Sequence, residues 1–82
     1  HRTTPQFWNR FARLPEPVQQ LARKNFELLK QNPRHPSLHF KKVNQFWSAR
    51  VGLSYRALAV EDGNDLIWVW IGSHNEYDQL LR

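Results

Sequence analysis

The sequence contains no cysteine, and only three of its 82 residues are glycine. Without cysteine there is neither a disulfide nor a thiolate metal site, as expected of an intracellular protein. With so few glycines there is no glycine-rich phosphate loop and no G-x-S-x-G motif. No apolar run approaches the length of a membrane span, and no signal peptide is visible. We therefore expect a single cytoplasmic domain covering residues 1–82.

Acidic residues are also scarce. Seven of them stand against twelve lysines and arginines, which gives a net charge of +5. No acid lies between Arg34 and Arg56, whereas three of the seven fall in residues 61–65. This balance favours an anionic partner such as nucleic acid, an acidic protein or a membrane surface. A solvated basic surface without a partner is the alternative.

The apolar bulk is concentrated in a predicted hairpin. Residues 66–71 are apolar at both alternating sets of positions, which predicts a central strand covered on both faces. In that strand Leu66, Trp68 and Trp70 are expected to share one face. The preceding strand is expected at residues 55–60. The turn between them contains Asp62-Gly63, a pair that tolerates the backbone of a tight hairpin.

Helices are predicted before and after these strands along the chain. Pro5 suits a first helical position, and an apolar stripe follows it as far as residue 14. A second helix begins near residue 16, ends at Asn32-Pro33, and places Asn25 inside its apolar stripe, where it needs a hydrogen-bond partner. Residues 73–76 read S-x-x-E, the capping box of a final helix. The predicted fold is α+β: an N-terminal helical hairpin packed on a twisted antiparallel sheet of three to four strands, with a short C-terminal helix.

Two weaker patterns suggest no chemistry of their own. His35 and His39 are four residues apart, but prolines interrupt any helix there and no third metal ligand is evident. The carboxylate pairs 62/65 and 76/78 fit turn and cap chemistry better than a glycosidase pair. We therefore expect neither a metal nor a small-molecule cofactor.

The strongest candidate site is a basic and aromatic set from the second half of the chain: Lys41, Lys42, Arg50, Arg56, His74 and Tyr77. Arginines can hold a phosphodiester while a histidine or tyrosine moves a proton, and this chemistry needs no metal. The free amides at the start of the final helix, beside His74, are expected to meet a phosphate. In the alternative, Arg50 and Arg56 pair with Glu76 or Asp78, and Tyr77 simply packs.

Three stretches together resemble a known family: LPEPVQQLARKNFELLKQNPRHPSLHFKKV, WSARVGLSYRALAV and IWVWIGSHNEYDQLL. The resemblance is to the RelE/ParE superfamily of type II toxin–antitoxin toxins, and within it to the RelE/HigB-like branch. It runs from about Phe7 to Leu81. It implies a RelE-like fold and a ribosome-dependent endoribonuclease that cuts mRNA in the ribosomal A site without metal, leaving 2′,3′-cyclic phosphate ends. The implied partners are a cognate antitoxin protein and mRNA on the ribosome, with no membrane.

The resemblance also implies residue roles. Arg56 matches the arginine that contacts the scissile phosphate, and His74 matches a phosphate stabiliser or general acid. Tyr77 matches a base or stacking group. Lys41, Lys42 and Arg50 fall at RNA-holding positions.

The chain departs from the family in three respects: its strands carry fewer basic residues than those of the strongest nucleases in the family, its C-terminal helix is short, and its N-terminal region differs. Relatives usually begin with a β-strand, whereas only four residues precede Pro5 here. The sequence also leaves other functions open. A ParE-like inhibitor of DNA gyrase, which needs no catalytic set, is one alternative function. A catalytically decayed homologue that retains only antitoxin binding is the other.

Overall fold

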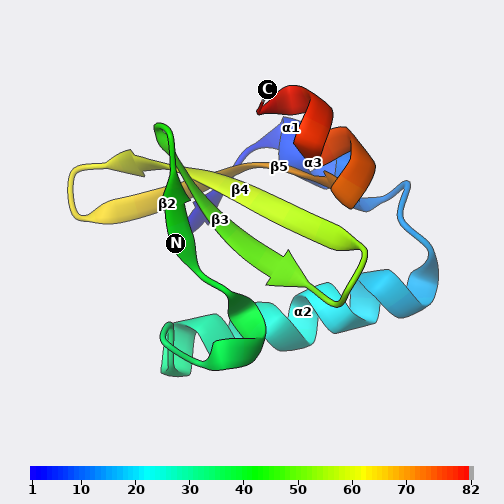
Figure 1. Ribbon diagram of the computed structural model, residues 1–82, viewed down its shortest axis with the longest axis horizontal. Helices are drawn as coiled ribbons and strands as arrows, with labels where there is room; N and C mark the ends of the chain where they lie inside the picture. The colour runs from blue at the N-terminus through cyan, green and yellow to red at the C-terminus, as the bar shows by residue number, and fades with distance from the viewer. Residues whose placement is uncertain (82) are drawn as a thin grey trace.

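The computed structural model describes residues 1–81, which form a five-stranded sheet with three α-helices (Figure 1). The elements are β1 (Arg2–Thr3), α1 (Pro5–Phe11), α2 (Glu16–Gln31), the 3-10 turn η1 (Pro36–Leu38), β2 (Lys41–Val43), β3 (Phe46–Val51), β4 (Tyr55–Asp62), β5 (Asp65–Ser73) and α3 (His74–Leu80). The strand order is β1-β5-β4-β3-β2, and only β1 runs parallel to its neighbour. The predicted α+β fold is confirmed, but the sheet has five strands in place of the three to four expected.

Both N-terminal helices begin where the sequence predicts. The Thr4 side chain caps α1 by accepting the Phe7 amide at 3.2 Å. This first helix ends at Phe11 rather than at residue 14, because the chain turns there into α2. The Gln19 amide spans the turn and donates to the carbonyls of Phe11 and Leu14, at 3.1 and 3.0 Å. None of the helices formed by residues 1–81 has the length and apolar composition required to span a membrane.

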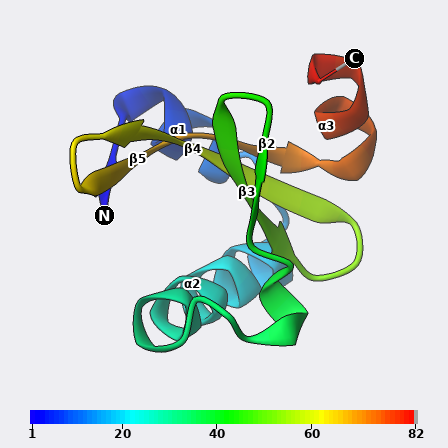
Figure 2. The same cartoon turned by 60° about the vertical axis from the view of Figure 1, so that its left-hand side comes forward.

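The core lies between these helices and one face of the sheet. It joins Phe11, Ala22, Leu29, Leu38, Ala49, Val51, Ala57, Ala59, Trp68 and Ile71. The Asn25 side chain meets its expected need for a partner by donating to the Arg50 carbonyl at 3.2 Å, which ties α2 to β3. β2 is the edge strand of the sheet beside β3, and α3 lies well away from α2 in Figure 2.

A β-bulge interrupts the pairing of β4 with β5. Leu58 is paired with Trp70, but the next residue, Ala59, is paired with Trp68, so Val69 has no partner on β4. The extra residue reverses the alternation of side chains along β5. Trp68 therefore faces the helices and is 3% exposed, whereas Trp70 lies on the opposite face. The expectation that positions 66, 68 and 70 share one face is wrong.

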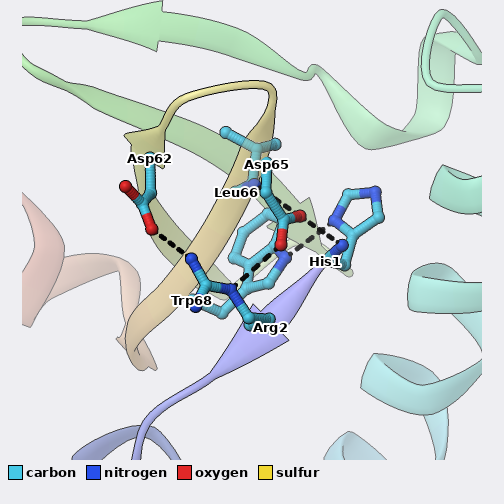
Figure 3. A network of polar contacts seen from close by, with 6 residues as sticks. All are labelled: His1, Arg2, Asp62, Asp65, Leu66 and Trp68. Atoms are coloured by element: carbon cyan, nitrogen blue, oxygen red, sulfur yellow. Dashed lines mark hydrogen bonds and ion pairs between the residues drawn. The ribbon is translucent and has the colours of Figure 1, made fainter.

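The middle of the sheet is also shifted by one strand from the prediction. β4 is the central strand, while β5 lies between it and the two-residue β1. Arg2 of β1 forms ion pairs with Asp62 and Asp65 of the hairpin turn, and the His1 ring accepts the Trp68 indole N–H at 3.1 Å (Figure 3). A strand thus precedes the first helix and pairs with β5, and the turn carboxylates are neutralised at the end of the β4–β5 hairpin far from Arg56.

Candidate functional site

Two arginines face each other across the middle of the sheet. Arg50 of β3 and Arg56 of β4 are direct cross-strand partners, on the face opposite Ala49 and Ala57 of the core. Like charges opposite one another destabilise a sheet. Burial lowers the pKa of the Arg56 guanidinium below its ordinary value, and the charge of Arg50 lowers that pKa further. This pair is a concentrated positive charge at the surface of the sheet.

Neither arginine is neutralised by a carboxylate within residues 1–81. Arg50 donates to the Gly52 carbonyl at 3.0 Å and lies 3.1 Å from the His39 ring nitrogen. Arg56 donates to the Tyr55 carbonyl at 2.8 Å. The remaining guanidinium N–H groups are available to an anion.

α3 brings the aromatic members of the predicted set to this pair. Gly72 and Ser73 of β5 lie opposite Arg56 and Tyr55, so the helix begins beside Arg56. The Arg56 Cζ atom is 6.0 Å from the centroid of the Tyr77 ring, and that ring is 6.1 Å from the His74 ring. The three residues that we predicted to be catalytic therefore lie together.

An open pocket of about 410 Å³ lies beside these residues. It is lined by Leu53, Ser54, Tyr55, Arg56, Ser73, His74 and Asn75. The loop between β3 and β4 forms one wall, the ends of β4 and β5 form the floor, and the first residues of α3 form the other wall. Leu53 is 80% exposed at the rim, where it offers an apolar surface to whatever enters.

The start of α3 is fixed by hydrogen bonds that also use its amides. Ser73 and Glu76 form the predicted capping box, in which the Glu76 amide donates to the Ser73 hydroxyl at 3.2 Å. The His74 amide donates to the Ser54 carbonyl at 2.7 Å. Two of the helix amides that we expected to meet a phosphate, those of His74 and Glu76, therefore already have acceptors among residues 1–81.

The two acids of α3 have partners other than the arginine pair. Glu76 Oε2 accepts from Arg10 Nη2 of α1 at 2.9 Å, and Asp78 Oδ2 lies 3.2 Å from His74 Nδ1. The alternative in which Glu76 or Asp78 neutralises Arg50 and Arg56 is therefore wrong.

Arg10 is a supporting residue that sequence reasoning missed. Besides its bond to Glu76, its Nε atom donates to the Ile71 carbonyl at 3.0 Å and its Cζ atom lies 5.1 Å from the Trp70 ring centroid. These contacts hold the end of β5 and the start of α3 against α1. No local sequence signal reports contacts between positions more than sixty residues apart.

The two lysines of β2 have different surroundings. Lys41 is paired with Ser48, which places it on the same face as Arg50, one row away from the arginine pair. Lys42 faces the other way and lies 3.3 Å from Glu61. Only Lys41 can therefore extend the basic patch, which we define as Lys41, Arg50 and Arg56.

His39 joins the edge of this patch through its contact with Arg50. A left-handed backbone at His39, with φ of 44°, turns the chain there from η1 towards β2. His35 has a different partner, because its Nδ1 atom accepts the Ser37 amide at 3.2 Å. The two histidines therefore do not share a site.

Comparison with solved structures identifies the class of fold. A RelB-RelE antitoxin-toxin complex from Methanococcus jannaschii contains a chain that superposes with a TM-score of 0.77 at 14% identity, covering 100% of both chains. A copper-bound mutant toxin from Helicobacter pylori superposes with a TM-score of 0.60 at 20% identity, covering 92% of this chain and 93% of the other. The fold is RelE-like.

Sequence comparison identifies the family. Residues 16–79 match the family described as ParE-like toxin domain. The chain belongs to this family, and so to the RelE/ParE superfamily of type II toxin–antitoxin toxins, as the resemblance predicted. No sequence among the curated proteins compared matches it.

Proposed function

We propose that this toxin is a ribosome-dependent endoribonuclease that cuts mRNA without a metal ion and so inhibits translation. The observation that carries the proposal is the pair Arg50 and Arg56, which lacks a carboxylate partner in residues 1–81 and adjoins His74 and Tyr77. A gyrase inhibitor that works by binding alone has no need of a proton-transferring histidine and tyrosine beside paired arginines. The resemblance to the RelE/HigB-like branch supports the same function.

The geometry suits cleavage by the neighbouring 2′-hydroxyl. The 2′ oxygen attacks the phosphorus and loses its proton, the bond to the 5′ oxygen breaks, and that oxygen gains a proton. Negative charge builds up on the phosphate oxygens during this step, and Arg56 is placed to stabilise it. Arg50 and Lys41, which both lie on the β3–β2 side of Arg56, hold the adjoining backbone, and His74 and Tyr77 serve proton transfer and stacking.

The protein partner is a cognate antitoxin. The solved relative from Methanococcus jannaschii is an antitoxin-toxin complex, which supports a partner of this kind. An acidic antitoxin segment would complement the net charge of +5 and speed association. An antitoxin that covered the basic patch would keep RNA from binding there. The surface whose coverage would inhibit the toxin is therefore also the surface that attracts an acidic partner.

The test is a primer-extension assay of mRNA on translating ribosomes with Arg56→Ala and His74→Ala. We expect Arg56→Ala to reduce cleavage by about a hundredfold or more, because a preorganised charge is lost at the developing phosphorane. The folded state should survive, since the change also removes a like charge opposite Arg50. Lys24→Ala, an exposed residue of α2 on another surface, is the matched control for loss of one positive charge.

Three outcomes would contradict the proposal. Undiminished cutting by both variants would mean that these side chains are not the catalytic ones. A toxic wild type that leaves mRNA intact but inhibits DNA supercoiling by gyrase would establish the gyrase alternative. A soluble, folded wild type that does neither, yet is captured by the product of the neighbouring gene, would identify a decayed homologue.

A further inference from the structure

Asp78 lies one helical turn after His74 on α3, with its Oδ2 atom 3.2 Å from His74 Nδ1. Both side chains are about half exposed, at 43% for His74 and 48% for Asp78. Asp78 forms no other ion pair among residues 1–81. Since an ionised carboxylate only accepts hydrogen bonds, a neutral His74 ring can donate to Asp78 across this distance only with its proton on Nδ1.

Helix stability does not account for an aspartate at this position. Asp78 falls in the last turn of α3, where a negative charge opposes the helix dipole. The acid of the first turn, Glu76, already supplies the favourable cap. A carboxylate in the last turn is therefore better explained by what it contacts.

We propose that Asp78 is a positioning residue that holds His74 in the Nδ1–H tautomer, so that Nε2 acts as the general base of cleavage. This assignment rests on the ribonuclease function proposed above. The ring nitrogen that Asp78 does not occupy has a free lone pair, which is the state a base requires. His74 is then the residue that starts the reaction, rather than the general acid or phosphate stabiliser that the family resemblance implies.

Cleavage starts at the 2′-hydroxyl. Nε2 takes the proton of the 2′-hydroxyl as the 2′ oxygen forms its bond to phosphorus. The bond from phosphorus to the 5′ oxygen breaks, and the departing oxygen takes a proton from water. The resulting imidazolium carries a proton on both nitrogens and is stabilised through Nδ1 by the Asp78 carboxylate. The products are a 2′,3′-cyclic phosphate and a 5′-hydroxyl.

The first test is the tautomer itself, measured by nitrogen-15 NMR of labelled wild type and variants at a pH where the ring is neutral. We expect the Nδ1–H form of His74 in wild type and mainly the Nε2–H form in Asp78→Ala. Asp78→Asn can still accept the Nδ1 proton through its amide oxygen and should retain more of the wild-type tautomer. Gln79→Ala, an exposed neighbour on α3, is the matched control.

The second test is the single-turnover rate of cleavage on ribosomes. Asp78→Ala should slow the reaction by about tenfold or more, within what a general base contributes. In the double variant His74→Ala/Asp78→Ala, cutting should be no slower than with His74→Ala alone, because Asp78 acts only through His74. If Asp78 had only a structural role, the fold-losses in cleavage rate of the two single variants would multiply in the double variant.

Each possible result decides a specific point. An unchanged tautomer in Asp78→Ala, wild-type cleavage by that variant, or multiplied losses in the double variant would overturn the role of Asp78 while leaving the ribonuclease function intact. A wild type that does not cut RNA would refute the function and, with it, His74 as a base, whatever the tautomer.

Discussion

Gly72 allows the Trp70 side chain to lie over the end of the sheet beside the site. A Cβ atom added at Gly72 would lie 2.7 Å from the Trp70 ring and 3.0 Å from Glu76 Oε1. The first distance is shorter than van der Waals contact, so the ring must move. Arg10 resists that movement because its guanidinium lies over the same ring at 5.1 Å. Gly72→Ala should therefore destabilise the protein by about 1–3 kcal/mol, the usual cost of overpacking.

The clash predicts that the effect of Gly72→Ala on stability changes sign when the Trp70 ring is absent. In a Trp70→Leu background the added methyl group has no ring to displace, and alanine is favoured over glycine in a strand by about 0.5–1 kcal/mol. The same substitution should then be neutral or slightly stabilising. Urea unfolding of wild type, Gly72→Ala, Trp70→Leu and the double variant measures this coupling. Equal destabilisation by Gly72→Ala in both backgrounds would refute the reasoning.

Two further predictions concern hydrogen bonds that position the site. Asn25→Ala leaves the Arg50 carbonyl without its donor from α2 and should cost about 1–2 kcal/mol in urea unfolding, whereas Gln20→Ala on the exposed face of α2 should cost little. The pKa of Glu76 is lowered below 4.5 by its hydrogen bonds to Ser73 and by Arg10. Its stabilising effect is therefore complete above that pH and lost as the pH falls through the lowered pKa. Wild type should lose more stability on acidification than Glu76→Gln, and parallel pH profiles would contradict this.

Local sequence signals predicted the elements because their chemistry acts over a few residues. The Asp62-Gly63 turn forms as expected, with Gly63 at a positive φ of 62°. The capping box joins positions 73 and 76, and proline begins α1 at residue 5. Each of these features is decided by side chains within about four residues, so one sequence is enough to find it.

The register of β5 could not be predicted in this way. Its side chains are apolar at both alternating sets of positions, so moving one residue to the other face breaks no hydrophobic pattern. The bulge at Val69 is specified by tertiary packing, because Trp68 is required in the core while Trp70 meets Arg10 of α1. The short β1 was missed for a similar reason, since two residues carry no periodicity.

The parts of the site that lie on strands joined by a short turn were predictable. Ion pairs between residues distant in the sequence were not. Arg50 and Arg56 face each other because only the turn at residues 52–54 separates their strands. By contrast, nothing near Lys42 in the sequence shows that it turns to Glu61 and away from the patch. Pairing of this kind depends on which face each strand presents, and that depends on the register.

The distribution of carboxylates explains why a basic patch persists in a chain that is only moderately basic. Among residues 1–81, six of the seven acids contact a cationic group or histidine. Only Asp78 among them lies at the site, and it contacts His74 rather than an arginine. The acids thus pair with Arg2, Arg10, Lys30, Lys42 and His74, and none of them forms an ion pair with Lys41, Arg50 or Arg56 of the patch. An anion that binds there gains charge-assisted hydrogen bonds without displacing an internal ion pair, which favours a phosphate backbone as the ligand.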